Sequence, residues 1–481
     1  METEPAQPVT GLGDCGLTWR GWLDSPPEVR KPRAGGRALL VSYLFPPTGG
    51  SGVQRPAKLA KYLPTFGWSI EVVTAGHHRF PWFDPSLLED VPADCRVHGI
   101  AGLEPAALAK RIGSRFEDSI YWRLARMTGW LGLGDGEALW VGPAARAALR
   151  RHREQPFDVL ISTGPPHFAH RVAIRVARAT GLPWVADLRD PLVIDYDRTP
   201  MSRREASAMR RVEQAIMRQA SLVVTTVPSL TEDLRGRYPG RLPDSIWTVP
   251  NGFDRDDLRA ALKTAAGARA EANDCVFVAA GAWYGRRELH RVVEPLQRVL
   301  ERNPLWGGRV RLVMAGTLDG QQRQRWEGQR PAWLTLAGYL DHASAIRLVA
   351  GSACAIVAVP DCQTGRLTIP AKTFELLALP THVLALVPPD SDTEQIVATA
   401  GASHVAPLED STMVASALEH IIGSHFAGIL AANRDWPVLD RYDRRMVAAA
   451  FADCLASACG PITWHRVACS QDGVGANGGA S

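Results

Sequence analysis

The stretch Ala38-Leu39-Leu40-Val41-Ser42-Tyr43-Leu44 leads directly into Phe45-Pro46-Pro47-Thr48-Gly49-Gly50-Ser51-Gly52-Val53-Gln54-Arg55. An apolar run that ends in a glycine-rich turn and opens a helix is typical of α/β proteins, in which the turn brings backbone amides against a phosphate or a sugar. The turn lacks the third glycine of a dinucleotide-binding loop and the Gly-Lys-Ser/Thr of a P-loop. We therefore predict a strand, a loop and a helix, with a loop that either approaches a ligand or forms only a tight turn.

Further along the chain, short apolar runs alternate with helix-length amphipathic segments, which is typical of parallel sheets with crossover helices. The first series of predicted strands covers residues 38–43, 69–74, 159–162, 184–187, 222–226 and 246–249. The second series covers residues 276–280, 310–315, 334–336, 354–359, 382–385 and 404–406. We expect an α/β fold of two doubly wound, Rossmann-like domains that face a central cleft, with ligands bound beyond the carboxyl ends of the strands.

The two series are separated by Pro250-Asn251-Gly252-Phe253-Asp254, because Pro and Asn-Gly are strong turn signals. We place a disordered extension at 1–36, an N-terminal Rossmann-like domain at 37–249 and a C-terminal Rossmann-like domain at 250–430. A helix at 431–459 is expected to pack back on the first domain, and 460–481 to form a flexible tail. Segment 76–140 fits the alternation poorly, and we interpret it either as an acceptor-side or membrane-proximal lobe or as a packing elaboration.

The length and charge of the chain limit its function classes. At 481 residues the chain is too long for one ordinary core, and its net charge of +4 does not indicate nucleic-acid binding. Two basic stretches, 146–153 and 201–220, form either solvated helix faces or contacts with anionic lipid. Eight scattered cysteines without metal-ligand spacing favour a reducing compartment and argue against structural zinc.

The N-terminal residues Met1-Glu2-Thr3-Glu4-Pro5 show neither the basic region nor the apolar region of a signal peptide. The longest apolar runs have the length of strands and are interrupted by charge, Gly or Pro, so we predict no transmembrane span. We expect a cytoplasmic protein whose contact with the inner face of the membrane, if any, is peripheral.

Two candidate ligand-binding segments follow strands of the first series. Residues 162–170 end one strand and place His167 and His170 at the start of a helix, where a neutral imidazole can donate or accept a hydrogen bond. The alternative is a capping or core histidine. The second segment holds Asp187, Arg189 and Asp190, which either bind a substrate or form an internal ion-pair cluster.

Two further segments lie in the second series. The loop Gly281-Ala282-Trp283-Tyr284-Gly285-Arg286-Arg287 offers close backbone approach and two guanidinium groups suited to a diphosphate. In residues 365–378, a proline at the first turn of a helix leaves amide donors that favour an anion, and Lys372 adds positive charge. Glu375 lies on the same helix face and can accept both hydroxyls of a ribose; the alternative is an intrahelical Lys-Glu pair.

In this order, the segments 42–55, 158–167, 186–191, 249–254 and 369–375 resemble the retaining glycosyltransferases of family 4, which have the GT-B fold. The resemblance is closest to the bacterial polysaccharide branch, whose members open with a Phe-Pro-Pro-x-x-Gly-Gly loop, and it covers about residues 38–455. It implies a nucleotide-sugar donor held mainly by the C-terminal domain and a glycan or lipid-linked acceptor held mainly by the N-terminal domain. It also implies a reaction on one face of the sugar, helped by the leaving phosphate, without metal or other cofactor.

The resemblance assigns roles to individual residues by motif position. It implies that Glu375 binds the ribose and that His167, or alternatively His170, touches the donor sugar. The backbones of Gly49 and Gly50 are expected at the reacting phosphate and sugar. Other donor-binding positions are Arg286, Arg287, Lys372, Thr368 and Ile369, and other substrate-binding positions are Gly52, Asp187, Arg189 and Asp190.

One position departs from the family pattern. A first glutamate usually stands eight residues before the second and contacts the sugar, and here that position is Leu367. With Leu367 at this position, the resemblance does not predict which sugar is transferred. An inactive nucleotide-sugar-binding scaffold is therefore one alternative. A GT-B-like nucleotide-sugar 2-epimerase is another, although it requires acid and base carboxylates around the sugar.

Overall fold

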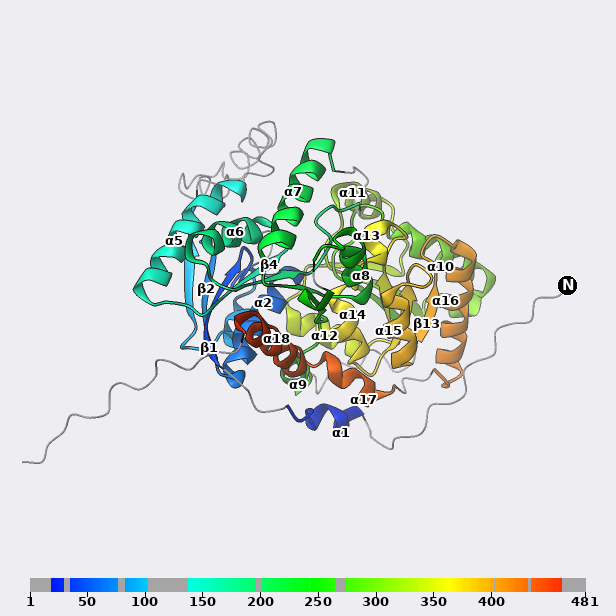
Figure 1. Cartoon of the computed structure of the whole chain (residues 1–481). Coiled ribbons are helices and arrows are strands. Elements are labelled where there is room, and N and C mark those ends of the chain that lie inside the picture. The colour runs from blue at the N-terminus through cyan, green and yellow to red at the C-terminus, as the bar shows by residue number, and fades with distance from the viewer. Residues whose placement is uncertain are drawn as a thin grey trace, which may run out of the picture.

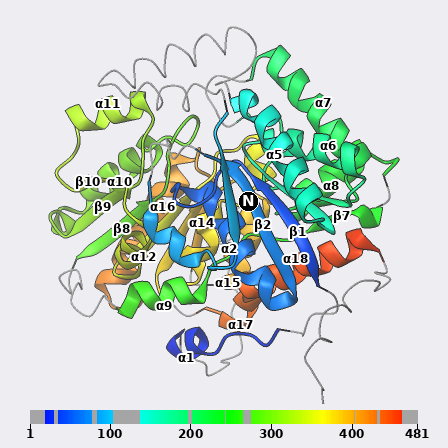
Figure 2. The same ribbon diagram turned by 90° about the vertical axis from the view of Figure 1, so that its left-hand side faces the viewer.

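The computed structural model describes residues 19–29, 35–76, 83–102, 137–195, 201–241, 243–263, 274–401, 403–430 and 434–460. Within them lie two parallel sheets, one in each half of the chain, and helices cover both faces of each (Figures 1 and 2). The expected α/β fold of two doubly wound domains is therefore confirmed.

The N-terminal sheet has seven strands in the order β3-β2-β1-β4-β5-β6-β7. Its central strands are buried on both faces, so their apolar runs are continuous and were visible in the sequence. The strands are β1 Gly36–Ser42, β2 Trp68–Ala75, β3 Arg96–Ile100, β4 Val159–Gly164, β5 Trp184–Leu188, β6 Leu222–Thr225 and β7 Ile246–Thr248.

The C-terminal sheet has six strands in the order β10-β9-β8-β11-β12-β13. In both sheets the first strand pairs with the second strand on one side and with a later strand on the other, which creates a switch point beside β1 and beside β8. The strands are β8 Cys275–Ala280, β9 Val310–Ala315, β10 Leu334–Gly338, β11 Cys354–Ala358, β12 His382–Leu386 and β13 Ser403–Ala406.

Each sheet forms two apolar cores, one per face. The N-terminal sheet packs on one face against α5 Val141–Glu154, α6 Phe168–Thr180, α7 Arg203–Gln219 and α8 Pro228–Arg237, and on the other against α2 Ser51–Tyr62 and α18 Arg444–Cys459. The C-terminal sheet packs against α10 His290–Arg302, α11 Gly320–Gly328 and α16 Ser411–Phe426 on one face. Its other face is covered by α9 Arg255–Lys263, α12 His342–Ala350, α14 Ala371–Leu377, α15 Asp392–Ala400 and α17 Trp436–Leu439.

Two sequence predictions are corrected by these elements. Strand β3 lies inside the segment 76–140, which seemed to interrupt the alternation; it is a mostly exposed edge strand without an apolar run. The segment 1–36 was predicted to be disordered, but Trp19–Asp24 forms helix α1 and the side chain of Trp22 is only 2% exposed. Apolar side chains at Trp19, Trp22 and Leu23 have helical spacing, and they pack on the C-terminal domain. Residues 30–34 and 1–18 lie outside the described part.

Two passages of the chain between the domains, at Phe253 and at Tyr442 to Arg444, lie side by side. Phe253 donates its backbone amide to the carbonyl of Tyr442 at 3.0 Å, and the amide of Arg444 donates to the carbonyl of Phe253 at 2.9 Å. After the second passage, α18 lies against the N-terminal sheet although it belongs to the C-terminal end of the chain (Figure 1).

The domains also touch away from these passages. The carboxylate of Asp195 accepts from the backbone amides of Gln363 and Thr364, at the start of helix α13 (Gln363–Arg366), at 3.0 and 2.8 Å. The backbone amide of Ser229 donates to Asp392 at 3.1 Å. The domains are therefore joined both along the chain and across the loops of the two sheets.

Candidate active site between the domains

A cavity of about 300 Å³ lies between the two domains. The N-terminal domain contributes Gly50 from the loop after β1, and the C-terminal domain contributes Gly281, Gly316 and Tyr339 from the segments that end or follow β8, β9 and β10. Because these are the carboxyl ends of parallel strands, the cavity lies where ligands bind in this class of sheet.

Three glycines shape the walls of the cavity. Gly50 has a φ of 94° and Gly281 a φ of 113°, which disfavour any other residue. A Cβ atom on Gly316, whose φ is 153°, would lie 1.8 Å from the carbonyl oxygen of Gly281. The loops after β8 and β9 therefore touch through their backbones. Backbone atoms of Gly281 and Gly316 form this part of the cavity wall.

Helix α14 brings two predicted residues, Lys372 and Glu375, to the same cavity. Glu375 Oε1 lies 2.9 Å from Nε2 of His342, and Nδ1 of His342 lies 3.7 Å from Oδ2 of Asp257. Burial alone would raise the pKa of Glu375, but His342, Lys372 and Arg444 lower it to about 2. Glu375 therefore faces the cavity as a carboxylate.

The same arrangement favours the protonated form of His342. Burial would lower its pKa, but the carboxylates of Glu375 and Asp257 raise it above its usual value. The imidazole thus fixes the orientation of Glu375 with one nitrogen and faces Asp257 with the other.

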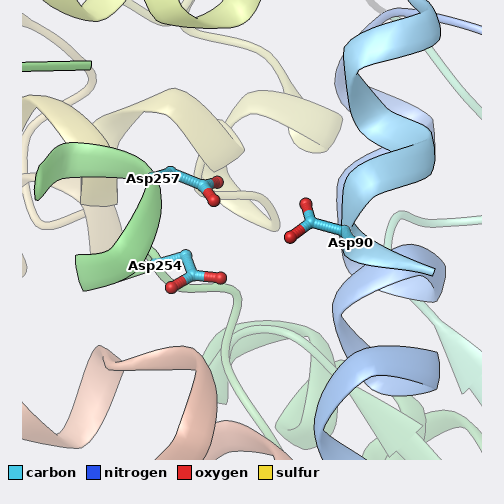
Figure 3. Close-up of side chains that lie close together, drawn as sticks. All are labelled: Asp90, Asp254 and Asp257. Carbon is cyan, nitrogen blue, oxygen red and sulfur yellow. The ribbon is translucent and has the colours of Figure 1, made fainter. Parts of the chain in front are cut away.

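Asp257 belongs to a cluster of three carboxylates with Asp90 and Asp254, which point toward one another from the two domains (Figure 3). Their spacing would suit a metal ion, but the ammonium of Lys58 lies among them, at 2.5 Å from Asp90, 2.8 Å from Asp254 and 2.6 Å from Asp257. The side chain of Lys58 is 2% exposed, and its pKa is raised because the carboxylates outweigh the effect of burial. This cluster is an ion-pair network that links α2 to α9.

The predicted substrate-binding residues of the N-terminal domain lie outside the cavity. Asp187 forms a fully buried ion pair with Arg55 at 2.8 Å. Arg189 donates to the carbonyl of Gly52 at 2.6 Å and to that of Gly164 at 3.2 Å. These side chains are engaged in holding the glycine loop and the loop after β4 together, which is the ion-pair alternative considered from the sequence.

Two other predicted positions lie near this network. Asp190 is half-buried, and its pKa is raised by burial and by Asp187 despite the neighbouring Arg189. Gly49 is buried beside Gly50 in the loop. Neither residue lines the cavity, so of the three predicted loop glycines, 49, 50 and 52, only Gly50 does.

His167 and His170 do not line the cavity. Both are buried, and a Cβ atom on Gly164 would lie 3.0 Å from Nδ1 of His167 and 2.8 Å from Nε2 of His170. Nδ1 of His170 lies 2.8 Å from the hydroxyl of Ser162. Burial and the charge of Arg189 lower the pKa of His167 to about 4, against a weaker opposing effect of the Pro191 backbone.

The low pKa of His167 predicts that the folded chain loses stability in acid. Because the pKa of His167 is lower in the folded chain than the usual 6.5, the unfolded chain takes up the proton first. Stability is then complete above pH 6.5 and falls as the pH drops toward 4, by up to about 3 kcal/mol from His167. We expect the free energy of unfolding of a His167→Leu variant to fall less between pH 7 and pH 4.5 than that of the wild type. An equal fall would contradict the neutral state of His167.

The remaining predicted residues of the C-terminal domain do not reach the cavity. Arg286 is exposed, and Arg287 donates to the carbonyl of Ala282 at 3.1 Å inside its own loop. Thr368 is buried and donates to the carbonyl of Thr364, while Leu367 and Ile369 pack against a core of the N-terminal domain. The position of the missing family glutamate is thus an apolar contact between the domains.

Among the cavity residues that the sequence did not indicate are Tyr339, His342 and Arg444. His342 follows Asp341, which caps α12, and a histidine at a helix start carries no specific signal by itself. Arg444 comes from the second passage between the domains, about seventy residues after Lys372 in the chain. Only the fold brings it to the cavity.

Residues 49–252 match a family model described as a glycosyl transferase 4-like domain. Among curated proteins, no sequence matches the chain. Sucrose-phosphate synthase from Thermosynechococcus elongatus is a similar solved structure, with a TM-score of 0.59 and 15% identity over 87% of this chain and 97% of that chain.

Two other solved structures cover this chain to the same extent. WaaG, a glycosyltransferase involved in lipopolysaccharide biosynthesis, has a TM-score of 0.55 and 13% identity over 87% of this chain and 99% of its own. UDP-GlcNAc 2-epimerase from Neisseria meningitidis, bound to UDP-GlcNAc, has a TM-score of 0.50 and 14% identity over 87% of this chain and 99% of its own. At these identities the similarity establishes the fold.

Proposed function

We propose that this chain, a two-domain protein of the GT-B fold with a glycosyl transferase 4-like domain over residues 49–252, transfers a sugar from a nucleoside diphosphate to a glycan or lipid-linked acceptor. The observation that carries the proposal is the cavity between the domains, which brings Gly50, Lys372 and Glu375 together. A flexible backbone, a cation and a carboxylate are suited to a sugar, a diphosphate and a ribose.

The proposed reaction proceeds with retention and requires only the chain's own groups. The bond between the anomeric carbon and the diphosphate oxygen breaks, and the acceptor oxygen bonds to that carbon on the same face. The acceptor proton passes to the leaving phosphate, so that the products are the glycoside and the nucleoside diphosphate. Lys372 stabilises the charge that develops on the leaving group.

A nucleotide-sugar 2-epimerase is the second candidate, because such an enzyme shares the fold. Its acid and base would have to come from Glu375 and Asp84, the two carboxylates that line the cavity within the described residues. Asp187, considered from the sequence, is held by Arg55.

The test is a panel of UDP-, GDP-, dTDP- and ADP-sugars, screened first by thermal stabilisation. Release of nucleoside diphosphate that depends on a glycan acceptor supports the transferase. Interconversion of the free nucleotide-sugar without acceptor supports the epimerase, and binding without turnover supports a scaffold.

We also propose that the acceptor side of the protein contacts anionic lipid. None of the described helices is long and apolar enough to cross a membrane. The neighbouring helices α5, α6 and α7 expose only two glutamates, Glu154 and Glu205, against a larger set of arginines. The exposed arginines are Arg146, Arg150, Arg153, Arg175, Arg178, Arg203, Arg204, Arg210, Arg211 and Arg218.

A triple variant R203Q/R210Q/R211Q is expected to lose vesicle binding, since each basic side chain near an anionic surface contributes about 1 kcal/mol. Co-sedimentation with phosphatidylglycerol vesicles measures the binding. Phosphatidylcholine vesicles, which carry no net charge, should bind neither the wild type nor the triple variant. R323Q/R325Q/R330Q removes three exposed arginines from the C-terminal domain and serves as the matched control. Equal binding by both triple variants would contradict the proposal.

A further inference from the structure

Among the described residues, Arg444 forms no salt bridge, although the carboxylate of Glu375 in the same cavity partly offsets the effect of burial on its pKa. Its side chain is 4% exposed and lines the cavity, and its Nη1 has no hydrogen-bond partner in the described structure. Asp443, its neighbour in sequence, accepts instead from the amide of Arg445 and lies 3.3 Å from Nε of Arg255. A buried guanidinium with an unused donor therefore faces the site.

Two physical effects oppose this position of Arg444. Removing a charge from water without a partner is unfavourable by several kcal/mol. Arg444 is also the first residue of α18, where the helix dipole disfavours a positive charge. Burial and the nearby charge of Arg55 accordingly lower the pKa of Arg444 to about 10. An anionic ligand that pairs with the guanidinium would remove both penalties.

The neighbouring residues leave room for such a ligand. Lys372 lines the same cavity, and both cations, together with His342, act on the carboxylate of Glu375. The arginines expected from the sequence to bind the diphosphate, Arg286 and Arg287, do not line the cavity. Lys372 and Arg444 are therefore the lysine and the arginine that line the cavity within the described residues, and they can both face an anion there.

We propose that Arg444 binds the diphosphate of the donor, as a second cation beside Lys372. This assignment rests on the proposed function, because it takes the cavity as the donor site. A guanidinium presents paired donors that match phosphate oxygens, and inside a cavity such charged hydrogen bonds are strong.

The test compares R444M with the wild type by calorimetry, using UDP, GDP, dTDP and ADP and the corresponding nucleosides. We expect R444M to bind the preferred diphosphate about 10- to 100-fold more weakly, the range for a lost hydrogen bond to a charged group, and to bind the nucleoside unchanged. Without ligand, R444M should melt at a higher temperature than the wild type, because it removes an unpaired buried charge.

Arg445 supplies the matched control. It is the next residue on α18, pairs with Asp256 at 2.7 Å and does not line the cavity, so R445M should keep the diphosphate affinity. R444K retains a charge and should lose less affinity than R444M.

Unchanged diphosphate affinity in R444M, or a lower melting temperature without ligand, overturns the assignment and indicates a structural role. If the wild type binds none of the four diphosphates, the proposed function fails together with the assignment.

Discussion

The variants Lys372→Ala and Glu375→Ala are each expected to weaken binding of the donor nucleotide by about 1.5 to 3 kcal/mol, the range for a hydrogen bond to a charged group. Lys372 offers a cation to the diphosphate, and Glu375 offers an ionised carboxylate to the ribose. Both side chains line the cavity, and His342 holds Glu375 at 2.9 Å, so neither has to be reoriented before the ligand binds.

Calorimetry with the preferred nucleotide-sugar measures both effects. Lys263→Ala is the control for charge, since Lys263 is exposed at the end of α9. Unchanged affinity in both cavity variants would refute this location of the donor site, even if the protein proves to be a transferase.

The second large effect concerns stability. Asp187→Ala is expected to lower the free energy of unfolding by about 3 to 5 kcal/mol, because it leaves the guanidinium of Arg55 unpaired in the core. Both side chains are at most 1% exposed, and Thr163 also donates to Asp187 at 2.7 Å. Arg55 further donates to the carbonyl of Pro250 at 2.7 Å, so the change extends to the passage between the domains.

Urea denaturation measures the loss. Glu154→Ala removes a half-exposed partner of Arg151 on α5 and should change stability by less than about 1 kcal/mol. A double variant Arg55→Met/Asp187→Leu should lose less than Asp187→Ala alone, because it leaves no unpaired charge. If Asp187→Ala lowers the free energy of unfolding no more than Glu154→Ala does, the buried pair of Arg55 and Asp187 does not stabilise the fold.

The fold could be predicted because its central strands are apolar on both faces. Each predicted strand overlaps an observed one, the family model matches residues 49–252 as a glycosyl transferase 4-like domain, and the similar structures share the two-domain fold. Strand β3 was missed because an edge strand need not be apolar. Helix α1 was missed because six residues with three apolar side chains form only a short pattern within a polar segment.

The candidate site was less accessible to sequence reasoning. Gly50 lies in the loop after β1, and Lys372 and Glu375 lie in α14, where the motifs predict them; all three line one cavity. The sequence does not determine the direction in which a side chain points. Both Lys372 and Arg286 were predicted to bind the donor, but Lys372 lines the cavity whereas Arg286 is exposed outside it. Asp187 looked suitable for a substrate, but its partner Arg55 lies over a hundred residues earlier, and such pairing depends on the tertiary fold.

The paired passages at Phe253 and Tyr442 have a mechanical consequence. Two tethers attached side by side restrict sliding and twisting between the domains more than a single tether does, and they least restrict a rotation about the line through both attachments. Displacement in such a rotation grows with distance from its axis, and α13 lies well away from α9 and α17 in Figure 1. The contacts of Asp195 with α13 therefore oppose such a rotation at a distance from its axis.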